Sequence, residues 1–308
     1  MVKMIGPIQL AEFEENGVRV VIALERDAKA DACLAATYTP RAPGFHLYDS
    51  GLPRTGINGV GRPTLLEIVT TQGIEPSGPL SASVAPLEDR LVGFDAPFTI
   101  YPDGPVTLRQ PIRISAGKQS ATAVLAITYM ACSSHGVCLP PVEYHRLAVT
   151  IPPADGAASA QVVTLDEAEE LSAAPSALGY NPDGDPFVGL AQAKTEATQS
   201  GKRILLEVGG DWCIWCHKLD HFFAENPDVA DFLDQHFVVL KVHYSTQIPN
   251  TAFLSQYPPV AGYPHIFMLD AQGSLLHSQN TGDLETGDHH DRAKVFAFLR
   301  QWAAEGTS

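Results

Sequence analysis

The 308-residue sequence has little positive charge, few cysteines and no long apolar run. Its 20 Lys and Arg residues against 35 Asp and Glu give a formal net charge of -15. Nucleic-acid binding depends on Lys and Arg side chains that displace counterions from phosphates, so this balance argues against a nucleic-acid partner. The most apolar stretch, ATAVLAITYMA, is shorter than the roughly 20 residues that cross a bilayer. The sequence therefore predicts a soluble globular protein.

The first residues, MVKMIGPIQLAEFEENG, lack the apolar segment and the small-residue cleavage site of a secretory signal. This favours a cytosolic protein, unless a signal has been removed from the sequence. The five cysteines are too few for a disulfide-rich scaffold, and they occur as Cys132-x5-Cys138, Cys213-x2-Cys216 and the single Cys33. Cys33 lies in an apolar strand pattern, which predicts a buried, inert thiol. The spacing of the other four is the informative feature.

The chain divides into two parts with different periodicity. Residues 1–151 contain short apolar segments separated by Pro, Gly, Asn and Asp, the pattern of an all-β, antiparallel sandwich. Residues 152–185 are rich in Ala, Pro and small polar residues, which indicates a linker. Residues 186–308 alternate between helical and strand patterns, which predicts an α/β domain. The strands expected in the first part are 18–24, 33–39, 64–69, 97–101, 106–114, 123–130 and 143–151.

The second part has a defined expected order of elements. A helix over 186–201 is followed by a strand over 203–208 and by a second helix over 215–235, interrupted at Asn226-Pro227. A strand over 237–244, a hairpin over 265–280 with its turn at 271–273, and a terminal helix over 290–305 complete the domain. The Cys213-x2-Cys216 pair lies where the first strand meets the second helix.

The stretch GDWCIWCHKLD allows two interpretations. Cys-x-x-Cys followed directly by His217 is the pattern of c-type haem attachment, whereas Cys-x-x-Cys after a strand is typical of a redox dithiol. The motif follows the apolar strand and begins an amphipathic helix, whose N-terminal N–H groups and positive dipole end stabilise a thiolate. The context therefore favours the dithiol.

Residues 186–303 resemble the thioredoxin-like family. ILLEVGGDWCIWCHKLD matches the family's strand, Trp-Cys-x-x-Cys and helix, and Pro264 in GYPH matches the proline that the family holds in cis opposite the dithiol. The resemblance implies that Cys213 is the exposed attacking thiolate and Cys216 the resolving thiol. It also implies that Glu207 is the family's buried acid, which exchanges a proton with Cys216 during resolution.

Asp220 matches a second acidic position of related membrane-tethered reductases. Together with Glu207 it is expected to raise the thiol pKa values by like-charge repulsion, against the helix dipole. Each assignment has a structural alternative: Glu207 facing solvent at a strand edge, and Asp220 as an ordinary exposed helix residue. Trp212 and Trp215 serve either in packing or in docking, and His217 is expected to be a solvated helix residue.

The second cysteine pair lies in CSSHGVCLPP, between two expected strands. One interpretation is a structural staple, but so short a loop gains only about 2 to 2.5 kcal/mol in the chain-entropy model. Another is a Cu(I) site formed by Cys132, Cys138 and His135, because thiolates prefer soft metals. A third is a second redox dithiol.

Residues 43–151 resemble the N-terminal immunoglobulin-like domain of the DsbD family of thiol:disulfide interchange proteins, through APGFHLY and ITYMACSSHGVCLPP. In that family the two terminal domains flank a membrane-embedded electron carrier, and the thioredoxin-like domain reduces the sandwich; no segment of this sequence matches the carrier. The resemblance implies attack of Cys213 on Cys138, with Cys132 as the partner of Cys138. The family shields its dithiol with an aromatic cap; LEDRLVGFDAPF lacks that cap sequence, although Phe94 is a candidate lid.

These resemblances predict a periplasmic protein-disulfide reductase of two domains, an immunoglobulin-like sandwich and a thioredoxin-like domain. Electrons are expected to pass from Cys213/Cys216 to Cys132/Cys138 and on to extracytoplasmic protein disulfides. The expected donor is an unidentified thiol protein, with a membrane protein as one candidate, and no cofactor or metal is expected. A disulfide oxidase or isomerase and a copper-binding module are the alternatives, because related dithiols span roughly -270 to -120 mV and the motif does not encode direction.

Overall fold

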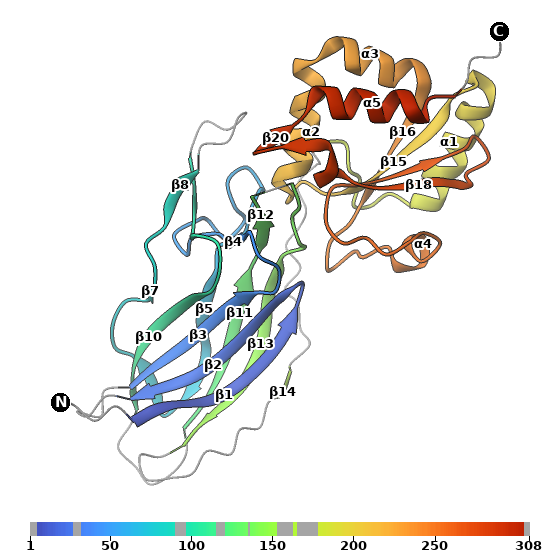
Figure 1. Cartoon of the computed structure of the whole chain (residues 1–308). Helices are drawn as coiled ribbons and strands as arrows, with labels where there is room; N and C mark the ends of the chain where they lie inside the picture. Colours follow the sequence, from blue (N-terminus) through green and yellow to red (C-terminus); the bar gives the residue numbers. More distant parts are fainter. Residues whose placement is uncertain are drawn as a thin grey trace.

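Two bodies make up the protein, a β-only part and an α/β part, joined end to end (Figure 1). The computed structural model describes residues 5–26, 32–89, 97–114, 121–134, 136–152, 163–164 and 178–304. The all-β sandwich and the thioredoxin-like domain expected from sequence are both present, in that order along the chain.

The β-only part is built from two packed antiparallel sheets. Among the described residues, one sheet has the order β1-β2-β3-β10-β6 with β7 also on β10, and the other has the order β14-β13-β11-β5. The first sheet comprises β1 (Ile5–Glu15), β2 (Val18–Arg26), β3 (Ala32–Pro40), β6 (Ile74–Pro76), β7 (Ser81–Ala82) and β10 (Val106–Ile114). The second comprises β5 (Leu65–Gln72), β11 (Ala121–Tyr129), β13 (Val142–Ile151) and β14 (Val163–Thr164).

Side-chain alternation explains why these strands form a sandwich. On β2, Val18, Val20, Ile22 and Leu24 are all fully buried, and the residues between them are more exposed. Because successive side chains of a strand point to opposite faces, this period of two places one apolar face on the opposing sheet. The same cluster includes residues of β3, β10, β11 and β13, so both sheets share one core.

Short strand pairs lie at the end of the sandwich nearest the α/β part (Figure 1). β4 (Phe45–Leu47) pairs with β12 (Ala131–Ser133), which contains Cys132, and β8 (Leu87–Asp89) pairs with β9 (Phe98–Ile100). β9 falls within the strand expected at 97–101, whereas the other three strands are too short to show a periodicity in the sequence. The β4–β12 pair positions the cysteine loop, residues 132–138, at the tip of the β-only part.

The segment predicted as a linker is only partly described. Its residues 163 and 164 form β14, which pairs with β13, and its last residues pack against the α/β part. Tyr180 is 1% exposed and belongs to the same buried cluster as β15. The exact limits of the linker stay a prediction, since residues 153–162 and 165–177 lie outside the described residues.

The α/β part has a central sheet of order β16-β15-β17-β18. Strands β15 and β16 are parallel, and β17 and β18 are antiparallel to their neighbours. The strands are β15 (Arg203–Gly209), β16 (Phe237–His243), β17 (His265–Leu269), β18 (Leu275–Asn280), and the separate pair β19 (Glu285–Thr286) and β20 (His289–His290). The helices are α1 (Pro186–Ser200), α2 (Ile214–Glu225), α3 (Pro227–His236), α4 (Thr251–Leu254), the 3-10 helix η1 (Thr281–Leu284) and α5 (Arg292–Trp302).

The two faces of this sheet bury different helices. Ala193 and Ala197 of α1 pack in one cluster with Ile204 and Leu206, whereas α2, α3 and α5 pack in another cluster with Leu205. The predicted break at Asn226-Pro227 is confirmed: α2 ends at Glu225 and α3 begins at Pro227. Among the helices that the structure describes, none is both long enough and apolar enough to span a bilayer.

Candidate functional site

The first dithiol lies at the junction between β15 and α2, as predicted. Cys213 is the N-cap of α2, and its Sγ accepts a hydrogen bond from the backbone N–H of Cys216 at 3.2 Å. A sulfur at this position occupies the place of a capping oxygen and lies at the positive end of the helix dipole. Both cysteines are free thiols in the structure.

Cys213 is not exposed, contrary to the expectation. Cys213 is 0% exposed and Cys216 is 1% exposed, because the sandwich covers the start of α2. This burial, followed by the interaction with Cys216, raises the pKa of the Cys213 thiol well above its usual range. Removal of water is thus the main cause, and the expected repulsion from Glu207 and Asp220 is not among the causes of this shift.

Glu207 is buried beneath the dithiol rather than exposed at a strand edge. It is 5% exposed, and its Oε1 accepts a hydrogen bond from the Tyr180 hydroxyl at 2.5 Å. Burial raises the pKa of the Glu207 carboxyl, opposed by the positive charge of Lys241 and by the hydrogen bond from Tyr180. A carboxyl with these partners is suited to exchanging a proton close to Cys216.

Asp220 lies on the exposed side of α2 and forms an ion pair with Lys241. The Nζ of Lys241 lies 3.0 Å from Asp220 Oδ1 and also donates to the Leu178 carbonyl at 2.8 Å. Burial of Lys241 is outweighed by the carboxylates of Glu207 and Asp220, so the pKa of Lys241 is raised. Lys241 pairs with Glu207 in the parallel β15–β16 register, so a single cation lies between the two acids.

The second cysteine pair forms a disulfide at the tip of the sandwich. Cys132 and Cys138 are bonded and both are 0% exposed. The hydroxyl of Tyr48 donates a hydrogen bond to Cys132 Sγ at 3.3 Å, in a fully buried setting. This contact places a proton donor on one sulfur of the bond.

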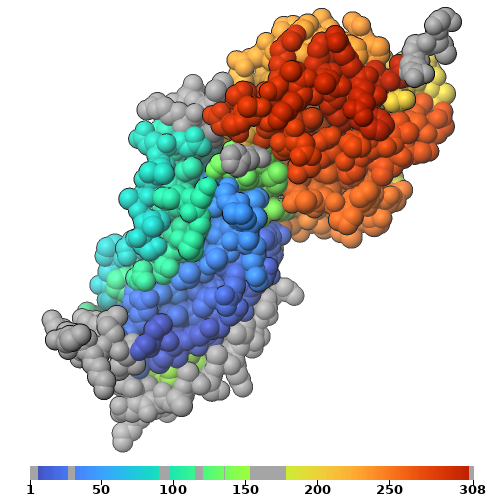
Figure 2. Space-filling view, in the orientation of Figure 1, coloured from blue at the N-terminus to red at the C-terminus, as the bar shows by residue number. Residues whose placement is uncertain are grey.

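The two cysteine pairs meet at the interface between the two parts. The backbone N–H of Cys138 donates to the Tyr263 carbonyl, and the N–H of Tyr263 donates to the Cys138 carbonyl, both at 3.0 Å. Tyr263 precedes Pro264 through a cis peptide bond, as the resemblance implied. All four cysteines belong to one buried cluster formed by residues of both parts. Figure 2 shows the C-terminal part packed on the tip of the sandwich.

Trp212 precedes Cys213 and Trp215 lies between the two cysteines. Both serve in packing and in the contact between the two parts of the protein. Trp215 is 2% exposed, and its indole N–H donates to the Ser133 carbonyl of the cysteine loop at 3.1 Å. Trp212 donates its indole N–H to the Tyr244 carbonyl within its own domain, while its backbone carbonyl accepts from Gly61 of the sandwich. Sequence reasoning left this choice open because aromatic residues beside a dithiol suit either role.

A buried carboxyl also lies at the interface. Glu285 is 6% exposed, and a Cβ on Gly136 would lie 1.6 Å from its Oε2, so the carboxyl is directly against the cysteine loop. His290 Nδ1 lies 3.7 Å from Glu285 Oε1, and its ring packs edge-on against Trp215. Neither Glu285 nor His290 could be predicted, since both residues lie in a polar segment without periodicity.

The structure differs from expectation at His217 and Cys33, and it does not describe two other residues of interest. His217 is not a solvated residue: its ring contacts the Asp211 carbonyl at 2.8 Å, and burial lowers its pKa. Cys33 is only partly buried, and burial raises the pKa of its thiol, as an inert thiol requires. Phe94, the candidate lid, and His135, the third copper ligand considered, lie outside the described residues. The described residues contain no group of three or more metal-ligating side chains.

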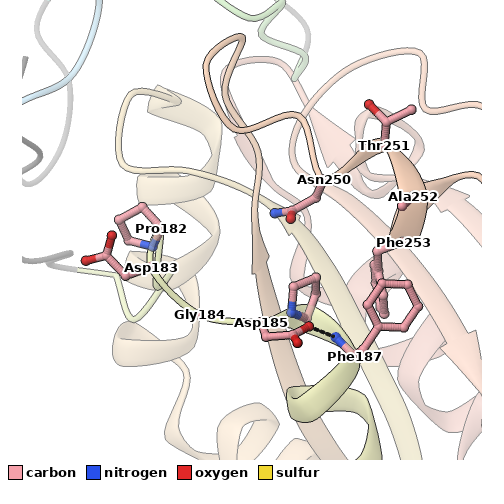
Figure 3. Close-up of a pocket in the computed structure, with 10 residues that line it drawn as sticks. Pro182, Asp183, Gly184, Asp185, Phe187, Asn250, Thr251, Ala252 and Phe253 are labelled. Atoms are coloured by element: carbon pink, nitrogen blue, oxygen red, sulfur yellow. Dashed lines mark hydrogen bonds between the residues drawn. The ribbon is translucent and has the colours of Figure 1, made fainter. Parts of the chain in front are cut away.

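A pocket of about 370 Å³ lies away from the cysteines, between the start of α1 and the loop leading to α4 (Figure 3). Asp185 caps α1 there by accepting a hydrogen bond from the Phe187 N–H at 2.8 Å. Pro182, Asn250 and Phe253 are among its lining residues, and no cysteine is. This pocket is therefore separate from the buried cysteine interface.

Known proteins are similar to parts of this chain. Residues 186–271 match a family model described as thioredoxin-like. The chain is 30% identical over 115 residues to the thiol:disulfide interchange protein DsbD of Klebsiella pneumoniae, a match covering 37% of this chain and 17% of that protein. It is 27% identical over 95 residues to the disulfide bond reductase DsbH of Chlamydia pneumoniae, covering 28% of this chain and 57% of that protein.

A comparison with solved structures also finds a DsbD domain. The reduced N-terminal domain of DsbD from Neisseria meningitidis matches with 20% identity and a TM-score of 0.26, covering 44% of this chain and 85% of that one. The chain matches 17% and 57% of the lengths of the two curated relatives, less than two thirds of either.

Proposed function

We propose that this chain, whose C-terminal domain is thioredoxin-like, is a thiol:disulfide oxidoreductase that acts as a protein-disulfide reductase. Two electrons pass from the Cys213/Cys216 dithiol to the Cys132–Cys138 disulfide, and from the reduced sandwich to disulfides of other proteins. The observation on which this rests is the backbone pairing of Cys138 with Tyr263, beside a reduced dithiol and an oxidised one.

The first step is attack of Cys213 on Cys138 Sγ, in which the Cys213 thiol gives up its proton. The Cys132–Cys138 bond breaks, a Cys138–Cys213 mixed disulfide forms, and Cys132 leaves as a thiolate that takes up a proton. The Tyr48 hydroxyl, which donates to Cys132 Sγ, stabilises this leaving group. The surrounding apolar cluster excludes water, which strengthens that hydrogen bond.

The second step is resolution by Cys216. Its thiol loses a proton to the buried carboxylate of Glu207, and the resulting thiolate attacks Cys213 Sγ. The Cys138–Cys213 bond breaks, Cys138 leaves as a thiolate and is protonated, and a Cys213–Cys216 disulfide remains. Two electrons have then moved from one pair to the other. The two protons taken up by Cys132 and Cys138 balance the one lost by Cys213 for its attack and the one that Cys216 transfers to Glu207, which Glu207 releases before the next cycle.

Asp220 and Pro264 support these steps without reacting. Asp220 holds Lys241 beside Glu207, and the charge of Lys241 favours the ionised carboxylate that accepts the proton. Pro264 shapes the loop that presents the backbone of Tyr263 to Cys138. Both are positioning residues in this scheme.

The proposed setting is the periplasm, with protein disulfides as substrates. The relatives DsbD and DsbH are named for disulfide interchange and disulfide reduction. The oxidised Cys213–Cys216 pair must be reduced again by another thiol protein, with a membrane protein as one candidate. The proposal invokes no cofactor or metal. The Cu(I) alternative requires two thiolates and therefore applies only to the reduced pair, whereas Cys132 and Cys138 form a disulfide here.

The test is to trap the intermediate in the full chain. Replacing Cys132 and Cys216 with Ser leaves Cys138 and Cys213 to form a stable bond under mild oxidation, which peptide mass spectrometry locates. The control variant also has Cys213→Ala, and Cys33→Ser is present throughout. A Cys138–Cys213 bond within one chain supports the proposal; recovery only of reduced thiols or of bonds between chains contradicts it.

The direction of transfer needs a separate measurement. A reductase requires the Cys213/Cys216 couple to have a lower reduction potential than the Cys132/Cys138 couple, and each 30 mV of difference corresponds to about 1.4 kcal/mol for two electrons. Equilibration of the full chain with glutathione buffers, followed by alkylation and mass spectrometry, gives both potentials. A reversed order would favour the oxidase or isomerase.

A further inference from the structure

Tyr180 comes from the segment that precedes α1, yet its side chain reaches the core of the dithiol site. It is 1% exposed, and its hydroxyl donates to Glu207 Oε1 at 2.5 Å. The Lys241 ammonium lies 5.4 Å from the centre of its ring. A buried phenol requires a hydrogen-bond partner, and this one has the proposed proton acceptor as its partner.

The same hydroxyl also lies close to the resolving thiol. A Cβ built on Gly209 would lie 2.6 Å from Tyr180 Oη and 2.6 Å from Cys216 Sγ. These two atoms can therefore be no farther apart than twice that distance. Charge on Cys216 raises the pKa of Tyr180, second only to burial among the causes. Tyr180 Oη thus lies within hydrogen-bond distance of the Glu207 carboxyl and within twice 2.6 Å of the Cys216 sulfur.

The chemistry of a phenol at this position is restricted. A tyrosine hydroxyl has one proton to donate and lone pairs with which to accept. Its proton is donated to Glu207, which leaves the lone pairs available for the Cys216 S–H. Burial holds the Tyr180 pKa well above its usual value, so a free tyrosinate does not accumulate. Tyr180 can accept a proton only while it passes its own proton on.

We propose that Tyr180 relays the proton from Cys216 to Glu207 during resolution of the mixed disulfide. The Cys216 S–H proton moves to Tyr180 Oη as the phenol proton moves to Glu207 Oε1. The products are a Cys216 thiolate, a neutral Tyr180 and a protonated Glu207, so charge and protons balance. This inference deepens the proposed function and rests on its assignment of Cys216 as the resolving thiol.

Tyr180 also fills space, and a test must separate that role from the relay. The Tyr180→Phe variant keeps the ring beside Lys241 and Gly209 and removes only the hydroxyl. A role in packing predicts lower thermal stability with an unchanged pH profile. A relay predicts a slower resolution step whose rate then depends on hydroxide.

The experiment uses the full chain with Cys33, Cys132 and Cys138 replaced by Ser, so that the reactive thiols are Cys213 and Cys216. The aromatic disulfide dithiobis(nitrobenzoate) reacts with Cys213 and releases one coloured thionitrobenzoate. Attack by Cys216 on the resulting mixed disulfide releases the second. The rate of the second release is followed by absorbance across a range of pH, in the parent, Tyr180→Phe and Glu207→Gln variants.

We expect Tyr180→Phe to slow the second release about 10- to 100-fold near neutral pH, within the range that general acid–base catalysis contributes. Its rate should rise with pH and approach the parent rate in alkaline solution. The first release should be unchanged, and the double variant with Glu207→Gln should be no slower than the slower single variant. Tyr257→Phe, a hydroxyl deletion at a partly buried tyrosine packed against the same cluster, should match the parent.

A second release within twofold of the parent, or one slowed equally at every pH, would overturn the relay. These outcomes leave the proposed function intact, since the Cys138–Cys213 bond is tested in other variants. A parent chain that releases only one thionitrobenzoate would instead show that Cys216 does not resolve, and would overturn both.

Discussion

Each of the two cysteine pairs in the proposed disulfide exchange has a buried tyrosine hydroxyl near it. Tyr48 donates to Cys132 on the sandwich, and Tyr180 donates to Glu207 beneath Cys216. Both phenols are fully buried, so each hydrogen bond acts in a setting of low polarity. The site is thus built from polar contacts inside an apolar cluster rather than from exposed thiols.

Removing the Tyr48 hydroxyl should slow reduction of the sandwich disulfide. A hydrogen bond to a developing thiolate is worth about 1.5–3 kcal/mol, which corresponds to roughly 10- to 100-fold in rate. The measurement is reduction of Cys132–Cys138 by glutathione in a full chain with Cys213→Ser and Cys216→Ser, with and without Tyr48→Phe. Tyr101→Phe, which removes another buried hydroxyl bonded to Ser50, is the control. Equal rates in all three chains would refute the role of Tyr48.

The space beside the Cys216 thiol leaves no room for a side chain at position 209. A Cβ there would lie 2.6 Å from both Cys216 Sγ and Tyr180 Oη, so Gly209→Ala should lower the free energy of unfolding of the α/β part by about 1–3 kcal/mol. Denaturant unfolding followed by tryptophan fluorescence measures this. Gly6→Ala, where no atom lies within 4 Å of the new Cβ, should change stability by no more than about 0.5 kcal/mol. An unchanged free energy of unfolding in Gly209→Ala would show that the packing around this position is looser than these distances indicate.

The sequence identified some of these residues and missed others for a physical reason. Glu207 and Pro264 lie at fixed spacings from a recognisable motif, so their positions could be predicted. Tyr180 lies in a segment rich in Ala and Pro without periodicity, and its partner Glu207 is 27 positions away. Tyr48 is 84 positions from Cys132. Contacts over such separations depend on the folded topology and leave no local pattern.

At the scale of elements, strong local signals were predicted well. The break at Asn226-Pro227 follows from the missing N–H and fixed φ of proline, and the strand alternation of β2 follows from burial of one face. The short strands β4 and β12 were not predicted. They exist because the cysteine loop folds back on the segment Phe45–Leu47, which is a tertiary event.

The turn around Gly262 and the cysteine loop fit together closely enough to be tested. A Cβ on Gly262 would lie 1.8 Å from Val137 Cγ1, so Gly262→Ala should separate the two parts without unfolding either. Cys213, which is 0% exposed, should then react several-fold faster with iodoacetamide, as measured by mass spectrometry. Adding Val137→Ala should restore protection. Unchanged labelling of the single variant would contradict the docked arrangement.

At the scale of the whole molecule, the docked arrangement was beyond prediction. The sequence resemblance implied that Cys213 reacts with Cys138, but the pairing of Cys138 with Tyr263 uses backbone N–H and carbonyl groups. Every residue type has these groups, so the pairing has no sequence signature. The indole of Trp215 also recognises a backbone carbonyl, that of Ser133.

Docking of the two parts should weaken as pH rises. Burial raises the pKa of Glu285 from 4.5 to about 8, against the attraction of Lys218 and Lys294 and with repulsion from Asp283. A raised carboxyl pKa means that the docked state holds a proton that the separated state releases. The contribution of Glu285 to the stability of the docked state is therefore fully present below pH 4.5 and is lost as the pH rises to about 8. His290, whose pKa burial lowers to about 4, is neutral across that window.

Small-angle X-ray scattering of the full chain measures this, since separation increases the radius of gyration. The radius should grow as pH rises through the window, and Glu285→Gln should remove most of the dependence. Asp288→Asn, which changes an exposed acid near the same segment, should retain it. A radius that is constant with pH, or one that grows on acidification, would contradict the role of Glu285.

The burial of all four sulfurs limits the access of other proteins to these cysteines. While its two halves are in contact, no third protein can approach Cys132, Cys138 or Cys213, because each is 0% exposed. In the proposed reaction, every cycle must therefore include a separation of the two parts and a later return to contact. Their tether keeps each at a high effective concentration for the other. An outside substrate must compete with that built-in neighbour, so the tether's length becomes a determinant of how fast the protein works.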